Sequence, residues 1–383
     1  MKTIIAAAYS SADLGVSSNG GSGGGVVVGA SGSVGGHDVA ACVKWSGPSV
    51  RGVAHRLRPH VEALAVLQWE LTFLLAGVVC PLLMVVLLCS TLWPIATLYL
   101  AWLVIDWRTP HRGGRRTNWV RNWGVWNYFR DYFPIKLVKT CDLSPSRNFV
   151  IGYHPHGVMC IGAFINFCTE ATGFAQLFPG IHPYVATLAG NFRIPLYREY
   201  LMAGCLCPVS RGAIDHLLSR GGPPGKAVVI VVGGAAESLQ SGDHGDCRVV
   251  LKGRKGFVRI ALQQGADLVP VYSFGEGATF KQLVFAEGTW KRRVQVAFQK
   301  AMGFAPCIFH GRALLSPDSW GVLPLPTPIL TVVGEPITVP HIPEPTAEDV
   351  DRYHALYVSG LQRVFNSHKA AYGLAESDTL IIQ

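Results

Sequence analysis

The sequence predicts an α/β fold in which a mostly parallel sheet is covered by helices. A membrane-embedded helical hairpin and a disordered N-terminal tail are expected to precede it. Three observations support this: a Gly/Ser-rich start, an uncharged run from Leu71 to Ile105, and β-branched runs that alternate with helical patterns after it. They divide the 383 residues into a tail (1–50), a basic flank with the hairpin (51–107) and an α/β domain (108–383).

The composition favours a globular domain attached to a membrane. Hydrophobic residues make up 49% of the chain and charged residues only 15%, with a net charge of +9. A positive charge suits nucleic acid, an anionic membrane surface or anionic substrates, and the hydrophobicity favours the membrane. The ten cysteines form no C-x-x-C pair, so we expect reduced thiols and neither a zinc site nor a disulfide framework.

The first 50 residues are too poor in large apolar side chains to offset the entropy of ordering, and the sequence therefore predicts disorder. The start, MKTIIAAAYS, has too short an apolar run for a cleaved signal peptide. Gly20 to Gly24 matches the G-x-S-x-G nucleophile elbow of lipases, which needs a strand before the serine and a helix after it. We interpret that match as chance, so a membrane lipid hydrolase is only an alternative.

The uncharged run from Leu71 to Ile105 is too long for one membrane span. As one helix it would be about 52 Å long, against a hydrocarbon core of about 30 Å. Ser90 to Pro94 supplies a break, which gives legs of about 71–89 and 93–105. The hairpin either spans twice or is re-entrant. A buried helical pair in a soluble core is the alternative.

Arginines lie on both sides of the hairpin, which predicts that both ends face the cytosol. The segment from Trp119 to Pro134 then mixes aromatic rings with arginines. Such rings can stack on bases, but next to a membrane hairpin they are typical of the interfacial belt, so we predict no nucleic-acid partner.

The remaining chain alternates buried strand patterns with helical patterns, which indicates a largely parallel sheet covered on both faces. The expected strands are 148–153, 226–232, 267–272 and 329–333, and the expected helices include 255–264 and a closing amphipathic helix over 349–369 that begins near Thr346.

Two predicted strands end in reactive side chains. The first runs into His154-Pro155-His156-Gly157, where Pro155 favours an extended His154 and places both imidazoles on one side of the chain. The next ends in two glycines and then Glu237. In an open parallel sheet these strand ends meet in one crevice, and a histidine with an orienting carboxylate can remove a proton from an alcohol. Two alternative interpretations remain. The two histidines could be metal ligands, although no third ligand lies at a recognisable spacing, or they could be structural imidazoles at a strand end.

The His154–Gly157 block resembles the type 2 diacylglycerol acyltransferase family, which also contains monoacylglycerol and wax-alcohol acyltransferases. The resemblance covers nearly the whole chain from about residue 60. The matching segments are Tyr132-Phe-Pro134, Thr187-Leu-Ala-Gly-Asn191-Phe-Arg193, Pro208-Val-Ser-Arg211, Gly233-Gly-Ala-Ala-Glu237-Ser238, Arg254-Lys-Gly-Phe257, Leu268-Val-Pro270, Phe274-Gly-Glu276 and Val333-Gly-Glu-Pro336.

The resemblance implies an enzyme that transfers a fatty acyl group from acyl-CoA to diacylglycerol, with no cofactor and no metal. Monoacylglycerol or a long-chain alcohol is the alternative acceptor. The expected catalytic residues are His156, His154 and Glu237. The expected substrate-binding residues are Asn191, Arg193, Arg211, Arg254, Lys255 and Gly157, with Lys252 as a further cation for the phosphates of CoA.

The resemblance also implies a protein of the endoplasmic reticulum membrane that reaches the lipid droplet surface, and it leaves a homo-oligomer open. The chain departs from the family pattern in one place: its Phe-Leu-x-Leu element reads Phe73 to Ala76. It departs from the wider glycerolipid acyltransferase pattern, H-x-x-x-x-D, because Met159 stands four residues beyond His154. A carboxylate partner must therefore be distant in sequence, and Glu237 is the candidate.

Overall fold

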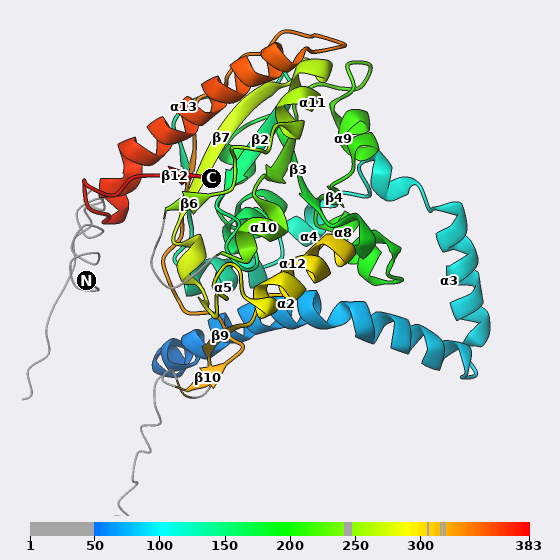
Figure 1. Cartoon of the computed structure of the whole chain (residues 1–383). Helices are drawn as coiled ribbons and strands as arrows, with labels where there is room; N and C mark the ends of the chain where they lie inside the picture. The colour runs from blue at the N-terminus through cyan, green and yellow to red at the C-terminus, as the bar shows by residue number, and fades with distance from the viewer. Residues whose placement is uncertain (1–49, 241–246, 305, 315, 317–318) are drawn as a thin grey trace, which may run out of the picture. The chain divides into compact units, whose positions relative to one another are not determined.

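The computed structural model describes residues 50–240, 247–304, 306–314, 316 and 319–383 (Figure 1). Within these ranges side chains are described from Leu57 onward, except for Met302. The predicted disordered tail and its G-x-S-x-G match lie outside the described residues, apart from Val50. Residues Leu57 to Gln383 form one compact unit.

A sheet of seven strands forms the centre of this unit, in the order β1-β11-β7-β2-β5-β3-β4 (Figure 1). The strands β7, β2, β5, β3 and β4 are parallel to one another, whereas β11 is antiparallel to β7 and parallel to β1. The mostly parallel sheet predicted from the sequence is therefore confirmed. The bounds of the strands are β1 Lys136–Lys139, β2 Phe149–His154, β3 His182–Thr187, β4 Leu206–Pro208, β5 Lys226–Val231, β7 Asp267–Phe274 and β11 Leu330–Val333.

Alternate residues of the central strands enter two separate cores, because successive side chains of a strand point to opposite faces. In β2, Val150 packs on one face with α9 (Arg211–Leu218), α11 (Gly256–Gln264) and α13 (Ala347–Tyr372). On the other face Phe149, Ile151 and Tyr153 pack with aromatic side chains of α2, α5 and η2. The bounds of these elements are α2 Val50–Leu88, α5 Val125–Tyr132 and η2 Phe164–Cys168. Helices thus cover both faces.

The closing helix α13 begins at a capping box, as the sequence predicts. The Thr346 hydroxyl accepts from the Asp349 backbone N–H at 3.1 Å, and the Asp349 carboxylate accepts from the Thr346 backbone N–H at 3.0 Å. Its inner face contributes Tyr357, Leu361 and Phe365, all fully buried, to the sheet. The closing helix therefore packs over the strands that carry the predicted site.

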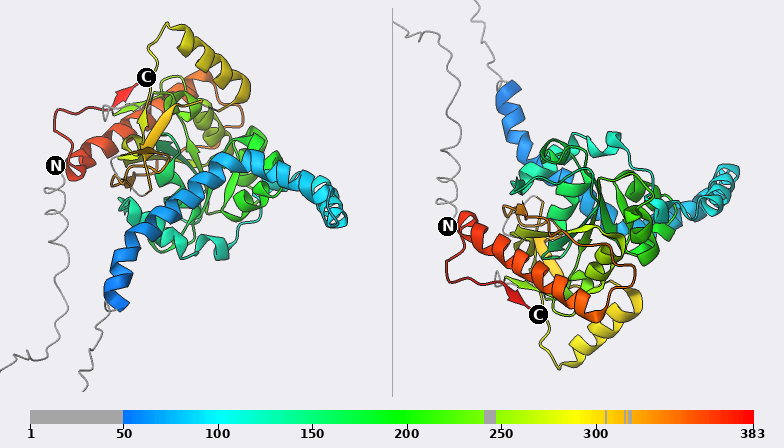
Figure 2. Two further views of the ribbon diagram at one scale, coloured as in Figure 1. Left: turned by 90° about the horizontal axis from the view of Figure 1, so that it is seen from below. Right: turned by 90° about the horizontal axis from the view of Figure 1, so that it is seen from above.

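The apolar run forms two helices, α2 and α3 (Trp93–Ile105), joined by a turn at 89–92. The turn lies away from the sheet in three views (Figures 1 and 2). Within the described residues, Leu57–Leu88 is the single helix segment long and apolar enough to cross a membrane, and α3 is shorter. Large apolar side chains such as Val78, Leu98 and Ile105 are exposed there, which suits lipid contact. The helical break thus lies near the predicted position, and α2 has the length and apolar surface of a helix that can cross a membrane.

The first helix begins much earlier than the uncharged run because its N-terminal half packs on the α/β domain. Ala63, Val66 and Trp69 are buried in the core, and the Trp69 ring lies 5.1 Å from that of Phe164. Helical spacing places these three side chains on one face. Packing against the domain thus begins before the uncharged run does, within the N-terminal half of the helix.

A buried ion pair attaches the end of the hairpin to the domain. The guanidinium of Arg198 on α8 (Tyr197–Ala203) is fully buried and donates to a carboxylate oxygen of Asp106 at 2.8 Å and to its backbone carbonyl at 2.9 Å. The same guanidinium approaches the Leu103 carbonyl at the C-terminus of α3 at 3.4 Å. A cation beside the last carbonyls of a helix is favourable.

Candidate active site

The candidate site lies at the carboxyl edge of three neighbouring strands. Because β2 lies between β7 and β5 and all three are parallel, the segments that follow them meet at one edge. These segments are His154–Gly157 after β2, α10 (Gly234–Ser238) after β5, and Gly275–Glu276 after β7. The sheet therefore brings together a histidine pair and two carboxylates that are far apart in sequence.

His154 is fully buried beneath α13 and is held by Tyr357. The Tyr357 hydroxyl donates its only proton to the Gly152 carbonyl at 3.0 Å, so it accepts from Nε2 of His154, also at 3.0 Å. Burial lowers the pKa of His154 to about 3. The ring is therefore neutral and enclosed, which suits a residue that holds the geometry of the turn.

His156 is partly exposed, and its ring contacts α10. Its Nδ1 lies 2.7 Å from the Ser238 hydroxyl and 3.2 Å from the Gly157 carbonyl. A carbonyl can only accept, so Nδ1 carries the proton and Nε2 keeps a lone pair. Burial is the largest influence on this ring and lowers its pKa to about 4, opposed by the backbone contacts. At neutral pH the Nε2 atom is therefore able to accept a proton.

The two imidazoles do not share one set of neighbours, although the sequence suggested one side of the chain for both. His154 contacts Tyr357 of α13, and His156 contacts Ser238 of α10. The sheet is covered by different elements on its two faces, and local chain direction cannot reveal which element each ring meets.

Glu237 is buried at the same edge, but its described contacts are with the main chain. One carboxylate oxygen accepts from the His156 backbone N–H, and the other accepts from the Val250 backbone N–H at 2.7 Å. Burial raises the pKa of Glu237 to about 7, opposed by these two N–H groups and by Arg254. The sequence suggested that Glu237 orients the imidazole, whereas the structure gives that contact to Ser238, the next residue of the helix.

A second carboxylate, Glu276, completes the edge and was given no role by the sequence argument. It is 1% exposed, accepts from the Tyr153 hydroxyl at 2.9 Å, and accepts from the Gly162 backbone N–H at 3.0 and 3.2 Å. Burial raises its pKa to about 7. Glu276 follows the third strand as Glu237 follows the second, so the strand-end argument could have identified it.

Gly157 lies against Glu276 in a conformation that favours glycine. Its φ is +61°, and a Cβ there would come within 2.9 Å of both the Cγ and the carbonyl oxygen of Glu276. The glycine of the motif is therefore required for the close approach of the turn to the end of β7, whatever its contact with substrate.

The predicted cations differ in their surroundings. Arg254 approaches the Gly233 carbonyl at 3.4 Å and so lies beside the turn that carries Glu237. Lys255 forms an ion pair with Asp351 at 2.6 Å, and Arg211 donates to Gln263 at 2.8 Å. Of these three cations, Arg254 is thus the one with a described contact to the segment that follows β5 at the candidate site.

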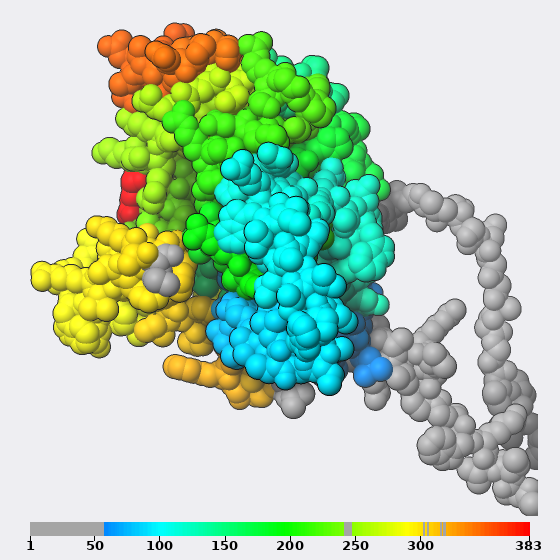
Figure 3. Space-filling view, turned by 90° about the vertical axis from the view of Figure 1, so that its right-hand side faces the viewer, coloured from blue at the N-terminus to red at the C-terminus, as the bar shows by residue number. Residues whose placement is uncertain are grey.

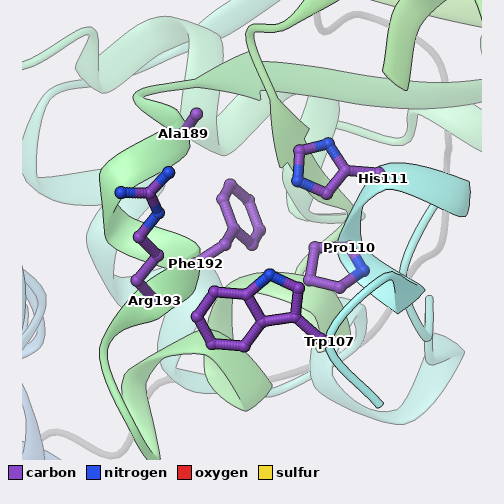
Figure 4. A pocket seen from close by; sticks show the side chains of 6 residues that line it. All are labelled: Trp107, Pro110, His111, Ala189, Phe192 and Arg193. Atoms are coloured by element: carbon purple, nitrogen blue, oxygen red, sulfur yellow. The ribbon is translucent and has the colours of Figure 1, made fainter. Parts of the chain in front are cut away.

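Asn191 and Arg193 lie on another element, η3 (Ala189–Arg193), which follows β3. Arg193 lines a small pocket of about 70 Å³ across from Trp107 and His111, with Phe192 between them (Figure 4). No described hydrogen bond or ion pair joins Asn191 or Arg193 to His156. Among the residues that the structure describes, no group of three or more potential ligands could hold a metal ion.

Comparison with known proteins identifies the chain at two levels. The family model described as "Diacylglycerol acyltransferase" matches residues 85–383, which places the chain among the acyltransferases. More narrowly, the chain belongs to the diacylglycerol acyltransferase family, as the motifs in its sequence predict.

Several relatives support this assignment over most of their length. Diacylglycerol O-acyltransferase 2 of Xenopus tropicalis is 60% identical over 84% of this chain and 89% of its own. The protein of that name from Danio rerio is 56% identical over 88% of this chain and 96% of its own. The human 2-acylglycerol O-acyltransferase 3 is 52% identical over 86% of this chain and 99% of its own.

Among solved structures, the 1-acyl-sn-glycerophosphate acyltransferase of Thermotoga maritima aligns with 81% of this chain and 95% of its own. Sequence identity is 12% and the TM-score is 0.34, which is too low for a structural argument.

Proposed function

We propose that His156 is the general base with which this chain transfers a fatty acyl group from acyl-CoA to diacylglycerol. The chain is a diacylglycerol O-acyltransferase, with acyl-CoA and diacylglycerol as its substrates. The observation that carries the proposal is the pair of contacts at Nδ1, with Ser238 and the Gly157 carbonyl, which leaves the lone pair on Nε2. A neutral imidazole in this tautomer can accept a proton from an alcohol.

The proposed reaction uses one proton transfer in each direction. Nε2 of His156 accepts the proton of the diacylglycerol hydroxyl as that oxygen attacks the thioester carbonyl carbon. The tetrahedral oxyanion then collapses, the carbon–sulfur bond breaks, and the imidazolium returns the proton to the departing thiolate. Triacylglycerol and CoA are the products, and no acyl-enzyme is needed.

Three other residues would position the base. Glu237 holds the backbone N–H of His156, Ser238 holds its ring, and His154 fixes the start of the turn against Tyr357. Gly157 would let the backbone approach the thioester closely, and Arg254 would place a cation near the phosphates of CoA. Asn191, Arg193, Arg211 and Lys255 remain predicted substrate-binding residues.

The variants that test the mechanism are His156→Ala, Glu237→Gln and the double variant, assayed with diacylglycerol and acyl-CoA. Each turnover is normalised to folded protein in the membrane. We expect His156→Ala to lose about 10²–10⁴ in rate, the usual contribution of a positioned base. Because Glu237 acts through His156, the double variant should be little worse than the worse single variant. An active His156→Ala protein would move the base elsewhere, and His216→Ala, an exposed histidine, is the matched control.

The acceptor alternative is monoacylglycerol, because one relative is named a 2-acylglycerol O-acyltransferase. The same preparation, supplied with diacylglycerol, 2-monoacylglycerol or a long-chain alcohol in turn, separates the three. If kcat/KM is higher with 2-monoacylglycerol or with the long-chain alcohol than with diacylglycerol, that acceptor is the preferred one.

We further propose that the hairpin anchors the chain in the endoplasmic reticulum membrane and at lipid droplets, with residues 1–70 and 106–383 facing the cytosol. Arginines on both flanks and the exposed apolar surface of α2 and α3 support this. Protease treatment of sealed microsomes is the test. Protection of either terminus without detergent would contradict the topology.

A further inference from the structure

We propose that α12 (Trp290–Met302) binds the phosphate groups at the nucleotide end of acyl-CoA. CoA carries a pyrophosphate and a ribose phosphate, so its binding surface needs cations. The inference rests on the proposed role of His156, because it explains how the thioester of a bound acyl-CoA reaches that base. It adds a site on an element for which the sequence argument gave no function.

Four cations on α12 are available for an anionic ligand: Lys291, Arg292, Arg293 and Lys300. Within the described ranges, no carboxylate forms an ion pair with any of them, and the sequence has no acidic residue between Glu287 and Asp318. Lys255 is by contrast paired with Asp351. A surface on which like charges gather without carboxylate partners attracts a polyanion.

Three of these cations lie along one flank of the helix. Arg292, Arg293 and Lys300, together with Val296 and Ala297, line an open groove of about 330 Å³. Seven residues make about two helical turns, so Lys300 lies on the same side as Arg293, two turns further along the helix. Phosphate groups separated along an extended ligand can therefore contact cations at both ends of the groove.

The groove begins next to the candidate base. The Arg292 guanidinium donates to the Leu239 carbonyl at 3.3 Å, and Leu239 follows Ser238, whose hydroxyl lies 2.7 Å from Nδ1 of His156. The Cys307 thiol, beyond the end of α12, also lies 3.4 Å from the Ser238 carbonyl. Two separate contacts thus attach the α12 region to the segment that carries the partner of His156.

The position of α12 leaves the groove open to solvent. Figure 3 shows the region around α12, in yellow, projecting from the surface beside the rest of the domain. Arg293 and Lys300 are exposed, and between Trp290 and Ala301 only Gln295 is buried. A nucleotide can therefore lie in the groove while its pantetheine arm extends toward the carboxyl edge of the sheet.

A phospholipid headgroup offers the same phosphate chemistry as CoA. A different side of α12 exposes Trp290, Val294 and Phe298, which are spaced by four residues and could face a lipid surface. The contacts of Arg292 near His156 favour the nucleotide as the occupant of the groove, and the test below separates the two sources.

The experiment compares oleoyl-CoA with oleoyl-3′-dephospho-CoA as acyl donors for the full chain in membranes. We expect Arg293→Gln and Lys300→Gln each to raise the KM for oleoyl-CoA about three- to tenfold, the range for partly exposed charge-assisted contacts. The KM for diacylglycerol should stay at the wild-type value. At least one of the two variants should reduce the difference in KM between oleoyl-CoA and oleoyl-3′-dephospho-CoA. Arg293→Lys, which keeps the charge, should recover most of the loss.

The control is Arg363→Gln, an exposed arginine of α13. A KM for oleoyl-CoA that stays at the wild-type value in both α12 variants overturns the proposal. Unchanged KM with weaker flotation on vesicles that contain phosphatidylserine also overturns it and assigns the groove to lipid headgroups. An active His156→Ala protein would instead refute the base assignment, and it would leave the KM result for the α12 variants intact.

Discussion

Replacing Glu237 by Gln tests whether this buried carboxylate supports the active edge through the main chain. Its two oxygens accept from the backbone N–H groups of His156 and Val250. An amide has one oxygen, so Gln can satisfy one of these donors and presents an NH₂ group to the other. The variant keeps the size of the side chain and removes one acceptor.

The expected cost follows from the unsatisfied donor. A buried N–H without an acceptor costs about 1–3 kcal/mol, so the free energy of unfolding should fall by that amount. For a chain of this size the midpoint of thermal unfolding should fall by about 1–4 °C. Displacement of His156 by 1 Å would cost on the order of 10² in turnover. We therefore expect Glu237→Gln to lose both stability and activity.

The measurements are thermal unfolding of the purified full chain in detergent, at one scan rate, and turnover in membranes. Glu376→Gln, an exposed carboxylate near the C-terminus, is the control and should leave both unchanged. A Glu237→Gln protein with wild-type unfolding and wild-type turnover would refute the reasoning. Unchanged unfolding with lower turnover and a shifted pH profile would instead place Glu237 on the imidazole ring.

Three further predictions concern the same edge. Ser238→Ala removes the 2.7 Å contact with an imidazole that keeps a backbone carbonyl as partner, so kcat should fall about 2- to 13-fold with KM for acyl-CoA little changed, and equal kcat would exclude the contact from catalysis. Burial raises the pKa of Glu276 to about 7, so its stabilising effect is present below about pH 4.5 and is lost as pH rises through 7. Between pH 5 and 8 the free energy of unfolding should therefore fall less for Glu276→Gln than for wild type, with a difference of up to about 3 kcal/mol, and parallel pH curves would contradict this. Gly275→Ala should destabilise the chain by more than about 2 kcal/mol, because φ is +86° and the new Cβ would lie 2.2 Å from the Pro328 carbonyl oxygen, whereas Gly277→Ala meets no atom within 4 Å and should unfold as wild type does.

The sequence by itself determined the main elements and the motif at the site. Strands β2, β5, β7 and β11 fall within a residue or two of the runs predicted from β-branched residues, because fully buried strands have continuous apolar sequences. The closing helix and its capping box could also be predicted from local sequence, because Thr346 and Asp349 have the spacing of a capping box. The His154–Gly157 block was found because it follows a buried strand directly.

Several strands and the direction of the last one were decided by tertiary contacts. The short strand β4 and the partly exposed β1 lack a strong apolar pattern and exist because a neighbour pairs with them. The antiparallel placement of β11 on β7 depends on the path of the preceding chain, which no local pattern encodes. The packing of Ala63, Val66 and Trp69 on the domain, before the uncharged run begins, is likewise a tertiary feature.

The partners within the site were also decided by the tertiary structure. Glu237 and Ser238 are consecutive in one short helix, and successive helical side chains point in different directions, so only the placement of α10 beside β2 decides which reaches the ring of His156. The sequence named the helix and the histidine. The packing of the parallel strands placed Ser238 at the imidazole and Glu237 at the backbone.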